Sequence, residues 1–401
     1  MRVLVCPHQM EMGGSQLNAV EMAAAVRNQG HESIVYAPDG VLVERVRTLG
    51  VEIVSAPEPG YGINRAWMRR LREVIQERRI DLVHAYEWGP CIEASFSAGM
   101  RRRVPVLMSI MAMEVPPFLP HHLPIAVGTP ALAEEQRRAA RRTYLLEPPV
   151  DMDVNRSIDV PAARRRWEIP AGELVVSVVS MLTTELEKLQ GILAAIAMVD
   201  RLAGEYPIRL LIAGDGEGFE QVSLRGKRVN ERHQRTVIQA VGFQADPSSI
   251  YEAADIVLGM GSSAIKGLAF GKPLIVQGAA GYWEAMDNGN SSKFVHRGWF
   301  GSDGAGAADL ENALRGLLDD PYRRAQLGGF GRSLVEDRYS LDGAARVLSD
   351  IYDEVLLERV PLARALTSLT RSAAATARFR TTMRLGGVLK QEQWNRMGVA
   401  L

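Results

Sequence analysis

A turn rich in glycine and serine separates two apolar segments in the second half of the chain. It reads Gly-Met-Gly-Ser-Ser-Ala from Gly259, and a short helix is predicted to follow it. Gly259 and Gly261 would let the backbone turn sharply and approach a ligand closely, and Ser262 and Ser263 favour the N-cap position. The free N–H groups and the dipole at the start of such a helix attract anions. The stretch therefore predicts an anion site, and a diphosphate fits it best.

Further turns of this kind follow other predicted strands. Gly13, Gly14 and Ser15 come after the first apolar strand, Gly214 belongs to a Gly-Asp-Gly turn after a later strand, and Phe243 follows the next one. Glycine at such places allows a close approach of the backbone to a ligand. The alternative is an ordinary strand-to-helix turn, and for Gly214 a purely structural role.

Two lysines could bring positive charge to the turns of the second half. Lys188 follows Thr183 and Thr184 after a predicted strand, and Lys266 lies about one turn into the helix after the glycine-serine turn. Because a helical side chain leans toward the helix N-terminus, Lys266 would reach a bound diphosphate. Each lysine could instead be an ordinary exposed residue on a helix surface.

These turns must be positioned by alternating strands and helices. Apolar strands are predicted at 2–6, 33–37, 51–56, 82–85, 106–110 and 125–127, and a second series at 174–179, 209–213, 237–241, 256–258 and 274–276. The alternation predicts parallel α/β sheets, whose ligands bind beyond the carboxyl ends of the strands. We expect one domain at 1–160, a second at 161–345, and a polar, proline-containing hinge at 148–170.

The order of these motifs resembles that of glycosyltransferases with the GT-B fold, most closely the retaining family-4 type. The resemblance covers roughly residues 1 to 355 and rests on the glycine-serine turn with its Gly-Lys-Pro stop, on Gly278-Ala-Ala-Gly281 with Glu284, and on the turns above. It implies two doubly wound, Rossmann-like domains that face a cleft, with the acceptor on the first and the donor on the second. It also implies C-terminal helices, at 346–401, that cross back to the first domain.

The resemblance also implies roles for the motif residues. The turn after the first strand meets donor phosphate or acceptor, backbone groups near Phe243 meet the nucleobase, and Gly281 and Glu284 meet sugar hydroxyls. Together with the residue chemistry it predicts a donor site made of Gly13, Gly14, Ser15, Thr184, Lys188, Gly214, Phe243, Gly261, Ser262, Ser263, Lys266, Gly281 and Glu284.

Three positions depart from the family pattern. Met181 stands where the family has an arginine on the diphosphate, Lys266 replaces a glutamate that accepts from ribose hydroxyls, and Met111 replaces a histidine near the reaction. A lysine cannot accept a hydrogen bond, so Lys266 would instead supply the positive charge that is missing at Met181. The leaving diphosphate can itself deprotonate the acceptor in retaining transfer of this type, so the change at Met111 does not exclude activity.

His84 and Glu114 are the candidates for catalytic contacts. His84 ends a predicted strand in Asp-Leu-Val-His-Ala, which matches a family position, although a hydrogen-bonded structural histidine is an equal alternative. Glu114 and Glu87 are loop carboxylates that could orient acceptor hydroxyls.

Composition and patterning exclude several other classes of protein. The 401 residues carry 47 basic and 47 acidic side chains, and this balance argues against a nucleic-acid binder. Cys6 and Cys91 are predicted to be buried thiols in a reducing cytoplasm. No apolar run reaches the ~18 residues of a membrane span, and the N-terminal segment reads as a core strand rather than a signal peptide. No metal-ligand cluster or P-loop ending is found, so we expect neither metal nor cofactor.

The tail at 360–401 is rich in arginine and contains one acid, Glu392. Arg364, Arg371 and Arg378 share a helical face opposite a thin apolar one, formed by Leu362, Leu366 and Leu369. This pattern predicts a surface helix packed on the first domain. A peripheral contact with anionic lipid or an acidic partner is the alternative.

Taken together, the residues and the resemblance predict a metal-independent transferase that moves a sugar from a nucleotide-diphosphate sugar to a hydroxyl acceptor. Retention of configuration is implied by the resemblance alone. The acceptor could be a carbohydrate, a lipid or a small natural product. Two alternatives stay open: a degenerate GT-B protein that binds a partner without turnover, and a nucleotide-sugar hydrolase or epimerase of the same fold.

Overall fold

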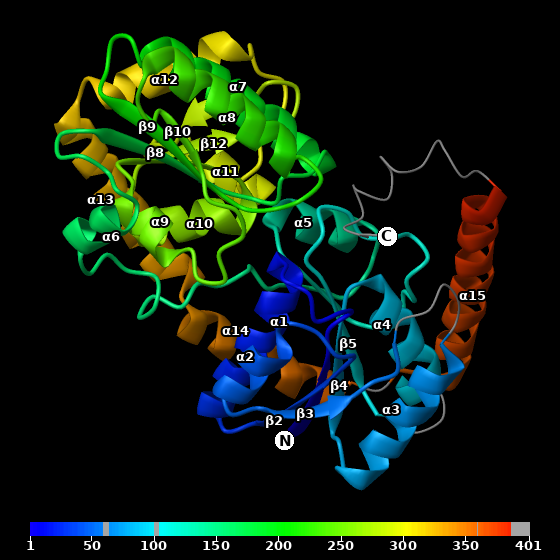
Figure 1. Ribbon diagram of the computed structural model, residues 1–401. Coiled ribbons are helices and arrows are strands. Elements are labelled where there is room, and N and C mark those ends of the chain that lie inside the picture. The colour runs from blue at the N-terminus through cyan, green and yellow to red at the C-terminus, as the bar shows by residue number, and fades with distance from the viewer. Residues whose placement is uncertain (59–63, 100–103, 359, 386–401) are drawn as a thin grey trace. The chain divides into compact units, whose positions relative to one another are not determined.

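The computed structural model describes residues 1–58, 64–99, 104–358 and 360–385 of the chain. Two compact units make up the protein (Figure 1). The first unit consists of Met1–Pro149 and the chain from Leu341 onward, and the second consists of Val150–Ser340. The chain therefore leaves the first unit, builds the second, and returns to complete the first.

The first unit contains a parallel seven-stranded sheet in the order β3-β2-β1-β4-β5-β6-β7. Its strands are β1 (Arg2–Cys6), β2 (Glu32–Ala37), β3 (Glu52–Ser55), β4 (Leu82–Tyr86), β5 (Val106–Ile110), β6 (Ile125–Val127) and β7 (Thr143–Leu145). Alternate residues of β1 face opposite sides: Leu4 and Cys6 join one hydrophobic core, while Val3 and Val5 join another. Both faces are thus buried, as expected for a parallel sheet.

Helices cover both faces of this sheet. They are α1 (Gly14–Ala25), α2 (Val43–Thr48), α3 (Arg65–Glu77), α4 (Trp88–Ala94), α5 (Pro130–Arg138), α14 (Leu341–Leu357) and α15 (Leu362–Leu385), with a 3-10 turn at Val26–Gln29 and a π turn at Ser95–Gly99. Local chemistry sets several of these helix starts. Asn64 caps α3 by accepting from the Trp67 N–H, and Thr129 caps α5 directly before Pro130.

The second unit contains a six-stranded sheet in the order β10-β9-β8-β11-β12-β13. The strands are β8 (Leu174–Val179), β9 (Ile208–Ala213), β10 (Ile238–Ala240), β11 (Ile256–Gly259), β12 (Leu274–Gln277) and β13 (Trp283–Ala285), and only β13 is antiparallel to its neighbour. The helices are α6 (Val160–Arg166), α7 (Lys188–Leu202), α8 (Phe219–His233), α9 (Ser248–Ala253), α10 (Gly261–Ala269), α11 (Ser291–Arg297), α12 (Ala307–Leu318) and α13 (Pro321–Tyr339), with a 3-10 turn at Glu185–Glu187.

The prediction of a hinge that runs to residue 170 is wrong. The segment after Pro149 packs on the second unit, because Glu252 accepts from the backbone N–H groups of Ile158 and Asp159. Arg164 forms an ion pair with Asp255 at 2.5 Å, and the Trp167 indole donates to Ser249 at 3.2 Å. The first unit therefore ends at Pro149, before the expected boundary at 160.

The connection from β5 to β6 carries no helix of its own. Residues 111–124 cross the sheet as loop, and α15 packs on them. The Ser372 hydroxyl donates to the Phe118 carbonyl at 2.6 Å, and the His122 N–H donates to Ser368 at 3.2 Å. A helix from the far end of the chain thus takes the place of a crossover helix.

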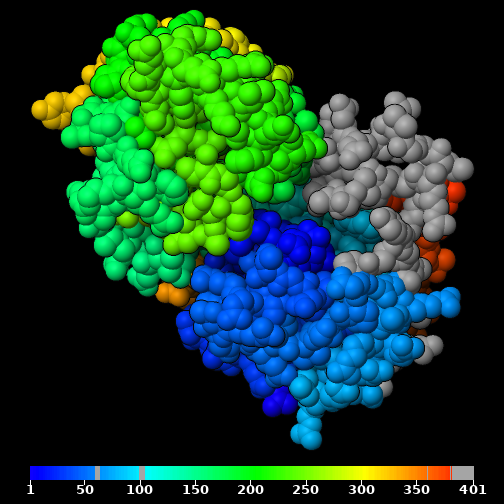
Figure 2. Space-filling view, in the orientation of Figure 1, coloured from blue at the N-terminus to red at the C-terminus, as the bar shows by residue number. Residues whose placement is uncertain are grey.

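The tail helix is oriented differently from the expectation. Leu369 is buried, but Leu362 and Leu366 are 58% and 45% exposed. The buried stripe instead follows Leu369, Ser372, Thr376 and Phe379, which places α15 against the first unit. Part of this helix, in red, forms surface in Figure 2. The rest of the basic tail, including Lys390, Glu392 and Arg396, lies outside the described residues. None of the helices in the described ranges is both long and apolar enough to cross a membrane.

Candidate functional site

Loops at the carboxyl edge of the second sheet are locked to one another. Gly214, after β9, donates its N–H to the Gly242 carbonyl at 2.9 Å, and Ser180, after β8, donates its N–H to the Ala213 carbonyl at 3.1 Å. Gly214 has φ 148°, and a Cβ atom there would lie 1.8 Å from the Ser180 carbonyl oxygen. Glycine is therefore required, and the structure gives Gly214 the packing role that the sequence left open.

Helix α10 starts at this edge, directly after β11. Its N-cap is Met260, in an extended conformation, and no side chain caps it. The prediction that Ser262 and Ser263 act as N-cap residues is therefore wrong, because the helix already begins at Gly261 and both serines lie inside its first turn. Ser263 instead donates its hydroxyl to the Met260 carbonyl at 2.9 Å, and the Gly261 N–H donates to the Trp299 carbonyl at 3.0 Å. Uncapped N–H groups of the first turn leave this helix start suited to an anion.

The two candidate lysines differ in their surroundings. Lys266 is partly buried in α10 and forms no hydrogen bond or ion pair with any described residue. Lys188, the first residue of α7, pairs with Glu185 at 2.9 Å and is 17% exposed. Thr184 donates both its N–H and its hydroxyl to Glu217, each at 3.1 Å. A ligand phosphate would thus find Lys266 free, and would have to compete with carboxylates for Lys188 and Thr184.

Backbone strain marks the loop between β8 and α7. Leu186 and Glu187 both have left-handed φ angles, 52° and 56°, a conformation that costs non-glycine residues about 1–3 kcal/mol each. The Glu187 carboxylate accepts from the Ala280 N–H at 2.9 Å, and Gln277 donates to the Glu187 carbonyl at 3.3 Å. These bonds hold the loop after β8 against the loop after β12.

The remaining predicted donor residues also lie at or beside this edge. Gly281 has φ 70°, in the turn between β12 and β13, and the Phe243 ring is 51% exposed after β10. Glu284, on β13, accepts from Asn290 at 2.9 Å and from Lys293 and the Tyr282 hydroxyl. Burial acts to raise the pKa of Glu284, but these three partners outweigh it and the pKa is lowered. Glu284 is therefore an ionised acceptor.

The carboxyl edge of the first sheet holds a second polar cluster, centred on Glu87. Gly13 is the N-cap of α1 and Gly14 its first residue, and the Ser15 hydroxyl donates to the Glu87 carboxylate at 2.7 Å. The Met111 N–H, after β5, donates to the same oxygen at 3.0 Å. Glu87 is 6% exposed and has φ 63°. Burial raises its pKa to about 7, against the opposing effect of the Ser15 and Met111 hydrogen bonds.

A histidine and a glutamine lie beside this cluster, in and after the turn that follows β1. Gln16 is 6% exposed, and its Nε2 contacts the His8 Nε2 at 3.3 Å. Because an amide NH₂ group can only donate, the His8 Nε2 is the acceptor, and the proton resides on Nδ1. That Nδ1 is buried and has no partner. It is therefore a buried donor that no described residue satisfies.

His84 lies in the core rather than at the surface. It is fully buried, and its two ring nitrogens contact the Tyr352 hydroxyl at 2.8 Å and the Ser109 hydroxyl at 2.7 Å. Burial lowers its pKa to about 3. The geometry favours the structural alternative for His84, because no nitrogen is left for a ligand. Glu114, in contrast, is exposed and forms no hydrogen bond with a described residue.

Models of known protein families match both units of the chain, including the loops at the carboxyl edges of the two sheets. Residues 12–144 match the family model "Glycosyltransferase Family 4", and residues 159–334 match "Glycosyl transferases group 1". The matched ranges contain both clusters of loops, in the order in which the chain presents them. The chain belongs to the family-4 glycosyltransferases of the GT-B fold.

Sequence relatives of this chain include two D-inositol 3-phosphate glycosyltransferases. The protein from Corynebacterium kroppenstedtii is 27% identical over 204 residues, which cover 48% of this chain and 43% of the relative. The protein from Thermobispora bispora is 27% identical over 241 residues, which cover 57% and 54%. The chain thus spans about half the length of the curated relatives that it matches.

Solved structures agree on the fold. A glycosyltransferase from Rickettsia africae ESF-5 superposes with a TM-score of 0.72 at 17% identity, covering 89% of this chain and 99% of that one. Anabaena Alr3699/HepE in complex with UDP gives a TM-score of 0.71 at 14% identity, covering 88% and 100%. At such identities the likeness shows the GT-B fold alone.

Within this chain the three departures from the family pattern lie at the two edges. Met181 follows β8 and is 48% exposed, Lys266 lies on α10, and Met111 supplies a backbone N–H to Glu87. Among the described residues no group of three or more histidine, cysteine, aspartate or glutamate side chains is arranged to hold a metal ion. Cys6 and Cys91 are buried free thiols.

Sequence reasoning gave Glu87 less weight than its surroundings justify, and it missed His8, Gln16 and Glu185. One signal was available for Glu87: a carboxylate comes within two residues of the predicted strand at 82–85, at the end where ligands of parallel sheets bind. Nothing in the sequence indicates the burial of Glu87 or the ion pair of Glu185.

Proposed function

We propose that this chain transfers a sugar from a nucleotide-diphosphate sugar to a hydroxyl acceptor. The uncapped first turn of α10, with the unpaired Lys266 one turn further on, carries the proposal. A diphosphate at this turn would accept hydrogen bonds from backbone N–H groups, and Lys266 would compensate the charge that Met181 cannot supply. Lys188 would exchange its Glu185 partner for phosphate oxygen.

The same edge offers places for the rest of the donor. The exposed Phe243 ring suits stacking against a nucleobase, and Gly281 with Glu284 suits sugar hydroxyls. Because the Anabaena relative is complexed with UDP, a UDP-sugar is the first donor to test. We infer that no metal is required, since N–H groups and two lysines supply positive charge.

We place the acceptor at the carboxyl edge of the first sheet, near Ser15 and Glu87. The name of the curated relatives makes D-inositol 3-phosphate the first acceptor to test. Retention of configuration belongs to this proposal, with the leaving diphosphate taking the acceptor proton. So does action in the cytoplasm, with the basic tail available for a peripheral contact.

Calorimetry with UDP, GDP, ADP, TDP and their common sugars tests the donor site. We expect one diphosphate to bind, and Lys266→Ala to weaken it roughly tenfold or more, because a charged hydrogen bond contributes about 1.5–3 kcal/mol. Lys227→Ala is the matched control, since Lys227 is an exposed lysine on α8 of the same unit. Equal affinity in all three proteins would refute the role of Lys266.

Product analysis then separates the alternatives. A glycosylated acceptor with the anomeric configuration of the donor supports transfer with retention. Free sugar formed without acceptor indicates a hydrolase, and an epimerised nucleotide sugar indicates an epimerase. Binding without any turnover would make the chain a degenerate GT-B protein.

A further inference from the structure

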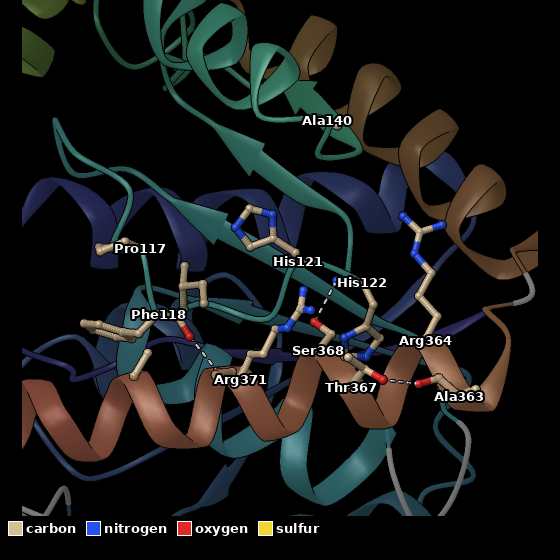
Figure 3. A pocket seen from close by; sticks show the side chains of 13 residues that line it. Pro117, Phe118, His121, His122, Ala140, Ala363, Arg364, Thr367, Ser368 and Arg371 are labelled. Atoms are coloured by element: carbon tan, nitrogen blue, oxygen red, sulfur yellow. Dashed lines mark hydrogen bonds between the residues drawn. The ribbon is translucent and has the colours of Figure 1, made fainter.

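A cavity of about 700 Å³ lies in the first unit, between the helix-free segment 111–124 and α15 (Figure 3). Its walls include His121 and His122, which directly precede the start of β6, and Ala140, which follows α5. These residues belong to the amino-terminal side of the sheet. The cavity is therefore separate from the carboxyl edge where Ser15 and Glu87 lie.

Every titratable side chain that lines this cavity is basic. Arg364 and Arg371 are spaced by two turns of α15, and Figure 3 shows both on the side of the helix where His121 and His122 lie. No carboxylate lines the cavity, and neither arginine forms an ion pair or hydrogen bond with a described residue. Two unpaired guanidinium groups thus face a space without a compensating charge.

One of the two histidines, His122, contributes a ring nitrogen that has no hydrogen-bond partner among the described residues. His122 is 9% exposed; its backbone N–H reaches Ser368, but its ring Nδ1 is buried and has no partner. Burial and the neighbouring cations Arg364 and Arg141 lower the pKa of His122 to about 4. Arg141, which follows the lining residue Ala140, is 4% exposed and donates to the Pro120 carbonyl at 2.9 Å. A neutral imidazole can still donate one hydrogen bond.

Another part of the wall is apolar. Pro117, Phe118 and Leu119 line it, and the Ser372 hydroxyl holds the Phe118 carbonyl at 2.6 Å. A cavity of this size accommodates a small organic molecule. The lining thus suits a ligand with a compact anionic end and a less polar remainder.

We propose that this cavity binds a phosphate group, held by Arg364 and Arg371 with His122 as a further donor, on a small organic molecule or a lipid headgroup. Arginine is suited to phosphate because its planar guanidinium offers paired donors. The site goes beyond the proposed transfer reaction. Helix α15 begins after residue 334, where the second family model ends, so the family match assigns no role to it.

Binding of glycerol 3-phosphate, inorganic phosphate and glycerol is measured by calorimetry on the full chain. We expect glycerol 3-phosphate to bind more tightly than phosphate, and glycerol not to bind. The double variant Arg364→Gln/Arg371→Gln should lose about tenfold or more in affinity. Arg346→Gln, an exposed arginine on α14 without a described partner, should bind as the wild type does.

Sedimentation with phosphatidylcholine vesicles, with and without phosphatidic acid, identifies the source of the phosphate. Binding that requires phosphatidic acid and is lost in the double variant assigns the site to a lipid headgroup. Binding of glycerol 3-phosphate alone assigns it to a soluble metabolite. The proposal is overturned if none of these probes binds, or if the double variant binds as tightly as Arg346→Gln. We expect UDP not to compete with glycerol 3-phosphate for this cavity. If the phosphate probes fail to bind, the proposed donor site on the second unit is therefore not refuted with them.

Discussion

Glu87 carries a carboxyl group that is poised to ionise near neutral pH. Since burial raises its pKa to about 7, the ionised fraction, which accepts a hydrogen bond from the acceptor hydroxyl and so orients it, increases through this pH. We expect kcat/KM to rise through about pH 7 in the wild type. Glu87→Gln should be roughly ten- to hundredfold slower at higher pH, without this inflection. A pH–rate series on both proteins is the measurement.

A second variant makes the assignment specific. The Ser15 hydroxyl bond lowers the pKa of Glu87, so Ser15→Ala should move the inflection to higher pH. If the inflection stays in place in Glu87→Gln, it belongs to another group.

Ionisation of Glu87 also affects stability. Its pKa in the folded protein lies above the ordinary value of 4.5, so the folded protein retains a proton that the unfolded chain has lost. This contribution is complete below about pH 4.5 and is lost as pH rises through about 7, with a total on the order of 3 kcal/mol. Glu87→Gln should lack this dependence in urea unfolding series across that range. An unchanged dependence would contradict the assignment.

At the scale of single residues, the sequence identified the glycine turns and the two lysines because strand-to-helix chemistry is local. It placed the N-cap at Ser262 or Ser263, two or three positions after the observed N-cap Met260, because the Gly261 N–H donates to the Trp299 carbonyl, which is distant in sequence. It treated His84 as an open question, because burial by Tyr352 arises only from tertiary packing.

Helix α14 is attached to the first sheet through a buried polar network. The Tyr352 hydroxyl contacts His84, which also contacts Ser109 on β5. Tyr352→Phe should lower the free energy of unfolding by about 1–3 kcal/mol, because His84 keeps a buried nitrogen without a partner. Tyr322→Phe is the control, since Tyr322 is 87% exposed. Denaturant unfolding checks both, and equal stability of the two variants would refute the role of the network.

At the scale of elements, the strong apolar strands were confirmed, while β7 and β13 were not predicted. Each has three residues, too few to show an alternating pattern, and Glu284 interrupts the apolar character of β13. The hinge was misplaced because a polar, proline-containing segment reads as a linker. Only its contacts with Glu252 and Asp255 show that it belongs to the second unit.

At the scale of the whole molecule, the second unit has the properties of an independent domain. Its three hydrophobic cores draw only on residues between 150 and 340, and the Val150 N–H donates to the Tyr339 carbonyl at 2.7 Å, which ties its ends together. We therefore expect residues 150–340, expressed alone, to unfold in one cooperative thermal transition. A broad transition without a calorimetric peak would contradict this.

Residues 1–149, in contrast, do not have the properties of an independent domain. One core of the first sheet includes Leu348, Ile351, Tyr352 and Val355 of α14. Without α14 this apolar face is exposed, so we expect the fragment not to fold cooperatively, and joining it to 341–385 to restore the transition.

Interruption of the first unit by the second has a consequence for synthesis on the ribosome. The first 149 residues leave the exit tunnel before α14 and α15 exist, and the whole of the second unit must be translated in between. At ~5–20 residues per second this delay lasts on the order of ten to forty seconds. During this time the apolar face of the first sheet that α14 later covers is exposed, and Phe118 is not yet packed against α15. The order of translation thus makes the packing of the C-terminal helices the last step in folding of the first unit, and makes its complete but uncovered sheet a substrate for chaperones in the living cell.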